Sequence, residues 1–271
     1  MVNNYGAEKE IIYNNTAITY YLKVNKGKET LFLLHPAFAD HEIFEAQLDC
    51  FSGNYQLILL DFPGHGKSHT KGTTVTMRDI PAIMKSILDE NKIVDCHIIG
   101  VSLGSLVAQA FADRYEKMVK SITIVGGYSI HKANEHILRA QVKEGLKWML
   151  YILFSMKKFK AYVTRVSTFN EIGREAFRHG INKFKRSSFP AMSNMKSLFT
   201  KKDTPMAYPL MIVCGEHDLQ LVKDAAIALH ALEPLSKYAL IPNAGHCVNV
   251  DNPDEFNAAL EGFLAQSGYI K

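Results

Sequence analysis

The stretch HIIGVSLGSLVA, residues 97–108, decides how the chain is interpreted. An apolar, strand-like run ends at Gly100, and Ser102 lies between this glycine and Gly104, just before a helix-like segment. A nucleophilic serine at the end of a buried strand needs a sharp turn that leaves its hydroxyl accessible, and glycines on both sides remove the resulting clashes. The pattern therefore predicts that Ser102 is a nucleophile. The alternative is a glycine turn with an ordinary helix-capping serine.

Six strand-like runs alternate with helix-like segments along the chain. Each run is short, apolar and rich in branched side chains, which is typical of strands buried on both faces of a parallel sheet. This alternation predicts a doubly wound α/β fold. Near the front, residues 11–24 alternate in polarity and predict an antiparallel hairpin that turns at Asn14 and Asn15. The buried strands are expected at residues 30–35, 56–61, 96–101, 121–125, 210–215 and 238–242.

The alternation stops once, in a helical, basic segment that is rich in Met and aromatic residues. From Tyr128 to Tyr208 there are 16 Lys and Arg against 5 Asp and Glu, a net charge of +11, whereas the rest of the chain carries −7. The segment begins after one core strand and ends before the next. We therefore interpret residues 127–208 as an inserted helical cap, with residues 1–126 and 209–271 forming the core.

A nucleophilic serine needs a general base, and the base needs an acid that orients it. Asp218 follows one strand-like run, and His246 lies in a glycine-containing loop after the last. Because open α/β sheets place their sites at the carboxyl ends of the strands, we predict a triad of Ser102, Asp218 and His246. Taken singly, the alternatives are a loop acid or helix cap for Asp218 and a solvated loop residue for His246. His217 is a rival base, but it would leave Asp218 without a role.

Attack by a serine creates a negatively charged oxygen on the substrate, which backbone N–H groups must stabilise. The Leu103 N–H, at the start of the helix after the nucleophile, is one predicted donor of this oxyanion hole. The loop after the first core strand should supply the other. Pro36 has no N–H, so Ala37 is the expected donor and Phe38 the reserve. We expect His35 to brace this loop by hydrogen bonds.

Five motifs in order make the chain resemble the α/β-hydrolase superfamily, specifically its esterase and peroxidase-like branch with a helical cap. The resemblance covers nearly the whole chain outside the cap. It implies an α/β-hydrolase fold, with a mostly parallel central sheet flanked by helices and an inserted helical cap. It also implies structural or pocket-rim roles for Asp61 and His65. The motifs are HPAFAD (35–40, with Pro36 where glycine is usual), DFPGHGKS (61–68), GVSLG (100–104), GEHD (215–218) and NAGH (243–246).

The nucleophile indicates the type of reaction. Serine rather than aspartate argues against the haloalkane dehalogenases and epoxide hydrolases that share this fold. Ser102 would attack a carbonyl, His246 would take and return the proton, and water would release the acyl group. We predict hydrolysis of a small or medium-chain carboxylic ester. Amidase, thioesterase, C–C bond hydrolase and perhydrolase activities on the same triad are alternatives, as is a small-molecule receptor outside the enzymes.

The apolar run WMLYILFSM, residues 148–156, is about half the roughly 20 residues that a membrane-spanning helix needs. A helix that is apolar all round favours burial, so we expect it to line an acyl pocket. We expect Phe38, Trp148 and Tyr151 to contact the substrate. The lysines around the run are either solvated helix ends or a basic surface that attracts anionic substrates or transiently contacts an anionic membrane. They are Lys143, Lys147, Lys157, Lys158 and Lys160.

Composition and spacing set the remaining expectations. Hydrophobic residues make up 47% and charged residues 21%, as in ordinary globular proteins. The first ten residues lack the pattern of a secretory signal, so we expect a cytoplasmic location. The four cysteines have no metal-like spacing, and no G-x-G-x-x-G or P-loop motif occurs. We expect no metal, no cofactor and no nucleic-acid partner, and a small-molecule acyl substrate as the ligand.

Overall fold

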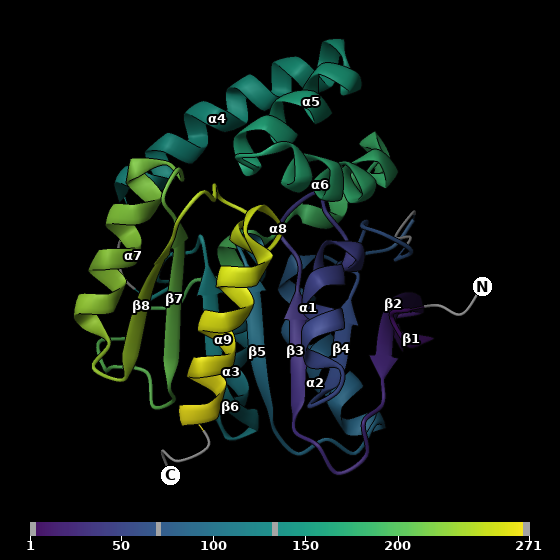
Figure 1. Cartoon of the computed structure of the whole chain (residues 1–271). Coiled ribbons are helices and arrows are strands. Elements are labelled where there is room, and N and C mark those ends of the chain that lie inside the picture. The colour runs from purple at the N-terminus through teal and green to yellow at the C-terminus, as the bar shows by residue number, and fades with distance from the viewer. Residues whose placement is uncertain (1–3, 69–71, 132–134, 268–271) are drawn as a thin grey trace.

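The protein is described by a computed structural model that covers residues 4–68, 72–131 and 135–267. Within these residues, an eight-stranded sheet has the order β1-β2-β4-β3-β5-β6-β7-β8 (Figure 1). Neighbouring strands are parallel from β4 to β8, whereas β2 pairs antiparallel with both β1 and β4. The predicted α/β fold with a mostly parallel sheet is confirmed. The strands are β1 (Ala7–Tyr13), β2 (Thr16–Lys23), β3 (Thr30–Leu34), β4 (Gln56–Leu60), β5 (Cys96–Val101), β6 (Val119–Val125), β7 (Leu210–Gly215) and β8 (Ser236–Ile241).

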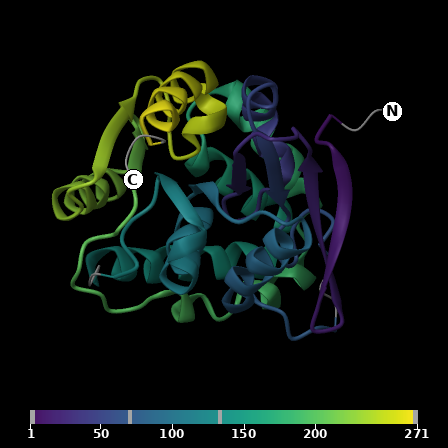
Figure 2. The ribbon, with the colours of Figure 1, turned by 90° about the horizontal axis from the view of Figure 1, so that it is seen from below.

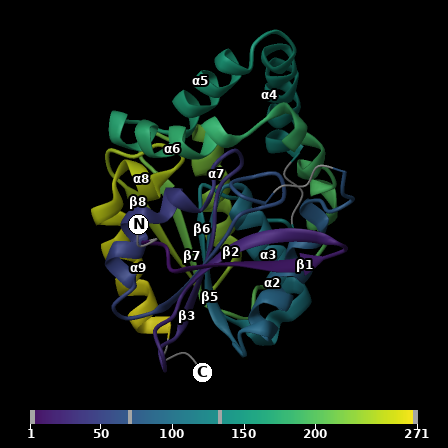
Figure 3. The ribbon, with the colours of Figure 1, turned by 90° about the vertical axis from the view of Figure 1, so that its right-hand side faces the viewer.

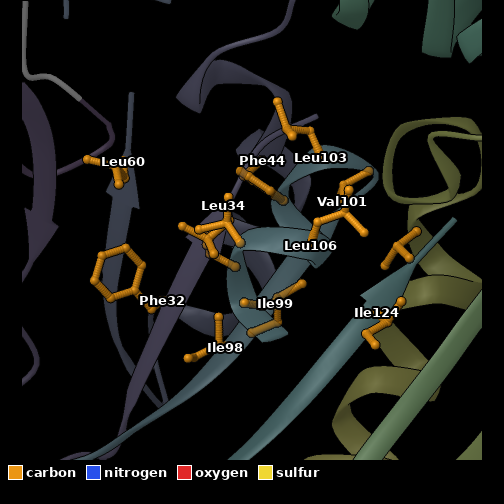
Figure 4. Close-up of a cluster of buried hydrophobic side chains, with 14 of the residues drawn as sticks. Phe32, Leu34, Phe44, Leu60, Ile98, Ile99, Val101, Leu103, Leu106 and Ile124 are labelled. Atoms are coloured by element: carbon orange, nitrogen blue, oxygen red, sulfur yellow. The ribbon is translucent and has the colours of Figure 1, made fainter. Parts of the chain in front are cut away.

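The central strands are buried on both faces because their apolar side chains lie in register. Phe32 of β3 is beside Ile58 of β4 on one side and Ile98 of β5 on the other, and Ile98 pairs with Ile122 of β6. All four side chains are fully buried. Figure 4 shows this core around Phe32, Ile98 and Ile124. Each such side chain contributes roughly 1.5–3 kcal/mol of burial free energy, which makes the sheet a rigid base for its loops.

The hairpin at the front forms the antiparallel edge of the sheet. Asn14 and Asn15 have φ angles of 47° and 59° and join β1 to β2. Two successive left-handed residues are typical of a type I′ turn, whose twist matches that of paired strands. The predicted hairpin and its turn are confirmed.

Helices cover both faces of the sheet, and they are α1 (Glu45–Phe51), α2 (Ile80–Glu90), α3 (Leu103–Tyr115), α7 (Gln220–Leu232), α8 (Val248–Asp251) and α9 (Pro253–Ser267). Helices α1 and α9 pack together on one face, and α2 and α3 pack together on the other (Figure 2). A short 3-10 turn, η2 (Met77–Asp79), leads into α2, and Thr76 and Asp79 close it with a capping box. This arrangement directs the carboxyl ends of the parallel strands to the top of the molecule in Figure 1.

A helical segment connects β6 to β7 and lies above these strand ends (Figures 1 and 3). Ser155 caps one of its helices by accepting a hydrogen bond from the Lys158 N–H, and Asn170 caps another by accepting one from the Gly173 N–H. Its described elements are α4 (Glu135–Phe154), α5 (Met156–Ser167), α6 (Glu171–Lys183), η4 (Arg186–Met192) and η5 (Met195–Leu198).

The apolar run in α4 is only half buried, so the expectation that this helix is buried was wrong for one of its faces. Trp148, Tyr151 and Ile152 pack against the core. The opposite face of the helix carries four exposed side chains, because α4 is an outer layer with nothing described above it. These are Met149, Leu150, Leu153 and Phe154. Among residues 4–68, 72–131 and 135–267, no helix combines the length and hydropathy that crossing a membrane requires.

Candidate active site

The turn between β5 and α3 has the strained geometry that the GVSLG motif predicts. Ser102 has a φ of 51° and a ψ of −111°, values that side-chain-bearing residues rarely adopt. A Cβ at Gly100 would lie 2.4 Å from the Gly104 carbonyl oxygen, and one at Gly104 would lie 2.2 Å from the Leu34 carbonyl oxygen. The two glycines thus allow α3 to begin directly against the ends of β5 and β3. Ser102 lies at the apex of this turn and is partly exposed.

A chain of hydrogen bonds joins the three residues of the predicted triad. The Ser102 hydroxyl lies 2.8 Å from Nε2 of His246, and Nδ1 of His246 lies 2.9 Å from Oδ2 of Asp218. Asp218 follows β7 and His246 follows β8, so loops from three separate strands meet at the top of the sheet. With its proton on Nδ1, the imidazole donates to the carboxylate and leaves Nε2 free to accept the serine proton.

The surroundings of the His246 ring determine its charge. Burial favours the neutral ring, but the negative charge of Asp218 and its hydrogen bond outweigh this effect, so the pKa of His246 is raised above its ordinary value. The Asp218 side chain is 1% exposed and the His246 side chain 20% exposed. Asp218 also accepts a hydrogen bond of 2.7 Å from the Leu219 N–H through its other oxygen. The acid is therefore fixed in place, while one edge of the base is accessible.

The oxyanion-hole prediction names backbone N–H groups on two segments, the start of α3 and the loop after β3. The Leu103 N–H is in the first turn of α3, where N–H groups have no acceptor within the helix. The Phe38 N–H donates a 3.1 Å hydrogen bond to Nε2 of His65, so it is already occupied and the reserve role of Phe38 was wrong. Ala37 and Leu103 stay the predicted pair of donors.

Two buried histidines hold the loops beside the serine. His35 contacts the Pro36 carbonyl oxygen through Nδ1 at 2.7 Å and accepts the Phe62 N–H at Nε2. His65 contacts the Pro63 carbonyl oxygen through Nδ1 at 3.0 Å. Burial lowers the pKa of both rings, that of His65 to about 3, so both are neutral. The expected bracing role of His35 agrees with these contacts.

Asp61 is a buried carboxylate with a structural set of partners. It accepts hydrogen bonds from the His41 N–H, the His41 ring and the Lys67 N–H. Burial raises its pKa, but the hydrogen bond and charge of His41 outweigh this effect, so the pKa is lowered overall. Asp61 thus stays ionised and ties its own loop to the one that follows β3.

The three predicted substrate-binding residues do not share one cluster. Phe38 is buried and packs edge-to-face against Trp148, with ring centroids 5.4 Å apart. Phe159 and Phe184 contact Phe38 in the same way, at 5.2 and 5.1 Å. Tyr151 instead packs against the ring of Tyr162, at 5.3 Å. The structure therefore joins Phe38 and Trp148 in an aromatic cluster, and a substrate role for any of the three stays a prediction.

Comparison with known proteins agrees with this fold. A family model of the alpha/beta hydrolase fold matches residues 29–160. Structurally, the chain is similar to a thermophilic esterase from Thermogutta terrifontis, with a TM-score of 0.80, 17% identity, and coverage of 97% of this chain and 99% of the other. The chain therefore has the fold of the α/β hydrolases and resembles their family model over residues 29–160. An enol-lactonase from Burkholderia xenovorans has the same fold, with a TM-score of 0.79, 15% identity, and coverage of 95% and 100%.

The chain also resembles curated proteins of similar length. It is 26% identical, over 96% of its own chain and 93% of the other, to a 2-hydroxy-6-oxononadienedioate/2-hydroxy-6-oxononatrienedioate hydrolase from Paraburkholderia phymatum. A protein of the same name from Escherichia coli K12 is also 26% identical, with coverage of 89% and 88%. The substrates in these names are dicarboxylic acids.

Gly126, which directly follows β6, is a site residue that the sequence motifs did not reveal. Its φ is 59°, and a Cβ there would lie 2.9 Å from the His246 ring. Only a residue without a side chain allows the imidazole to reach Ser102 along this path. The pair Gly126-Gly127 after a buried strand was the available signal, since such a pair marks a close approach of backbone to another group.

Asp251 is the second residue that the sequence analysis missed. Its side chain is buried and accepts three backbone hydrogen bonds, from Gly245 at 2.9 Å, Phe169 at 2.8 Å and Asn170 at 3.3 Å. Gly245 precedes His246, whereas Phe169 and Asn170 form the connection between α5 and α6. One carboxylate therefore ties the histidine loop to the helical segment. The only sequence signal was an acid five residues after the histidine.

We expect Asp251→Asn to lower the free energy of unfolding by about 2 kcal/mol or more, because an amide has one accepting oxygen and would leave buried N–H groups unsatisfied. Urea unfolding followed by circular dichroism measures the change. Asp254→Asn, an exposed acid on α9, is the matched control and should have little effect. Equal stability of the two variants would contradict the structural role of the Asp251 carboxylate.

Proposed function

We propose that the protein is a serine hydrolase that cleaves a small or medium-chain carboxylic ester through an acyl-enzyme on Ser102. The observation that carries the proposal is the hydrogen-bonded chain from Ser102 through His246 to Asp218, with the serine held at a positive φ. A hydroxyl, an imidazole and a buried carboxylate in this order are what nucleophilic acyl transfer requires.

The proposed reaction proceeds in two halves. Oγ of Ser102 attacks the ester carbonyl while Nε2 of His246 takes its proton, and the N–H groups of Leu103 and Ala37 stabilise the oxyanion. The intermediate collapses when His246 returns the proton to the leaving alcohol, which breaks the C–O bond. Water then attacks the acyl-enzyme while His246 takes its proton. The bond between Oγ and the acyl carbon breaks, His246 returns the proton to Ser102, and the carboxylic acid leaves. Each step needs only protein groups and water.

The aromatic side chains next to the predicted donor Ala37 support a neutral, apolar acyl group. Phe38 follows the predicted donor Ala37 and lies in a cluster with Trp148, Phe159 and Phe184. Nearby, the buried rings of His35 and His65 are neutral, so neither supplies a positive charge for an anionic substrate. Aromatic side chains of this size favour medium-length or aryl acyl groups over acetyl, because they bury more apolar surface.

Hydrolysis of a carbon–carbon bond is the second candidate, and the names of the curated relatives favour it. The same serine would attack the ketone, but the leaving group would be a carbon atom that must be protonated. Diacid substrates would also require positively charged or polar groups for two carboxylates, and the contacts described around Phe38 are apolar. We therefore rank ester hydrolysis first.

A substrate comparison distinguishes the two candidates. We expect kcat/KM for p-nitrophenyl hexanoate to exceed that for p-nitrophenyl acetate, because the longer chain buries more apolar area. We expect both to exceed that for 2-hydroxy-6-oxonona-2,4-dienedioate, followed by loss of its dienol absorbance. Faster turnover of the diacid than of either ester would reverse the ranking and assign the triad to carbon–carbon bond cleavage.

Removal of the nucleophile tests the acyl-enzyme. Ser102→Ala should lower kcat/KM by at least about 10³-fold, since the remaining groups stabilise the transition state without a nucleophile. A fluorophosphonate should label the wild type at Ser102, as detected by mass spectrometry, and should not label the variant. Ser86→Ala, whose hydroxyl donates to the Ala82 carbonyl oxygen within α2, is the control that should keep most activity. Undiminished turnover by Ser102→Ala would show that Ser102 is not the nucleophile.

The raised pKa of His246 predicts the pH profile. His246 must be neutral to accept the serine proton, so kcat/KM should rise with pH and level off above an inflection that lies higher than about 6.5. Asp218→Asn removes the charge that raises this pKa, so the inflection should move to lower pH while activity falls by roughly 10⁴-fold. Asp224→Asn changes an exposed acid on α7 and should alter neither the pH of the inflection nor the activity. A rate independent of pH between about 5 and 8 would argue against histidine as the base.

A further inference from the structure

The last turns of α4 expose an apolar face that the fold does not use. Met149, Leu150, Leu153 and Phe154 are 50%, 54%, 63% and 82% exposed. Their spacing places all four on one side of the helix, opposite the side that packs on the core. We call these four residues the α4 face. Single exposed apolar residues are ordinary on protein surfaces, but four adjacent ones form a patch.

Positive charges surround the α4 face. Lys157 and Lys158 follow it at the start of α5 and are exposed. Among the described residues, neither lysine lies within ion-pair distance of a carboxylate. Arg186 reaches the face from η4, where its guanidinium donates a 3.3 Å hydrogen bond to the Leu153 carbonyl oxygen. Apolar side chains and cations thus occur together on one surface.

The position of this surface suits contact with a large, flat partner. The turn between α4 and α5 is the part of the helical segment farthest from the sheet (Figures 1 and 3). A planar surface can therefore reach the α4 face without contacting the core. The surrounding region is strongly basic, since residues 128–208 carry a net charge of +11.

We propose that the α4 face and its surrounding cations bind an anionic lipid surface. Apolar side chains of an interfacial helix enter the boundary between headgroups and acyl chains, while Lys and Arg contact lipid phosphates. A second copy of the chain fits less well, because an interface between two identical basic surfaces would bring like charges together. The proposal does not depend on the role of Ser102.

Sedimentation with vesicles tests the proposal on the full chain. We expect binding to phosphatidylcholine vesicles that contain 30% phosphatidylserine to exceed binding to phosphatidylcholine alone, and to weaken in 0.5 M NaCl, where the screening length is a few Å. Leu153→Gln/Phe154→Gln and Lys157→Gln/Lys158→Gln should each reduce this binding by at least about tenfold. Ile12→Gln/Val94→Gln changes two apolar residues that are 65% and 79% exposed elsewhere, and it should bind like the wild type.

Three results would overturn the proposal: no binding to either vesicle, equal binding to both, or an equal loss in the Ile12→Gln/Val94→Gln control. A concentration-dependent dimer that the α4-face variants abolish, without vesicle binding, would assign the surface to a second copy instead. Circular dichroism and ester turnover of each variant show that it is folded, since none of these substitutions touches the triad.

Discussion

The close approach of α3 to the ends of β5 and β3 is the constraint on which the rest of the site depends. Gly100 and Gly104 leave no room for a methyl group, because a Cβ at either would lie within 2.4 Å of a carbonyl oxygen. Any side chain there would push the helix away from the sheet and shift Ser102 and the Leu103 N–H together. The positive φ of Ser102 costs on the order of 1–3 kcal/mol, and the buried parallel strands on either side offset it. A rigid sheet is therefore a requirement for the strained turn.

The base depends on a second set of contacts, which reach beyond the core. Asp251 connects the N–H of Gly245 to those of Phe169 and Asn170, and the Cys247 N–H donates to the Ser167 carbonyl oxygen at 2.8 Å. Residues on both sides of His246 are thus bound to the helical segment. A displacement of α5 and α6 would therefore shift the imidazole as well, because hydrogen bonds hold the residues immediately before and after His246. The position of the helical segment and the position of the His246 ring are therefore coupled.

The features that the sequence predicted were those determined by local patterns. The apolar runs predicted the strands, the Asn14-Asn15 pair predicted the hairpin turn, and the glycines around Ser102 predicted its backbone conformation. Several of the contacts that it missed join residues distant in sequence. Asp251 acts on partners 81 and 82 positions away, and the Phe38 N–H finds its acceptor 27 positions away.

The exposed side of α4 shows a different limit of prediction. Apolar composition favours burial, but it does not supply a second layer to bury both faces of a helix. The pattern of residues 148–156 is the same whether α4 lies between two layers or on the outside. Only the packing of Trp148 and Tyr151 toward the core, with Leu153 and Phe154 on the other side, distinguishes these cases. The composition of this helix therefore identified an apolar surface without indicating which side was covered.

Three histidines near the site differ in what their rings contact, and this difference determines which of them can titrate in the neutral range. His35 and His65 contact a carbonyl oxygen and accept a backbone N–H, so a second proton would displace the N–H donor and create an unpaired buried charge. His246 contacts a carboxylate instead, and protonation at Nε2 creates a cation beside an anion. The same burial that keeps His35 and His65 neutral therefore strengthens the attraction between His246 and Asp218. A single imidazole can then exchange protons with Ser102 while its neighbours hold the loops without changing charge.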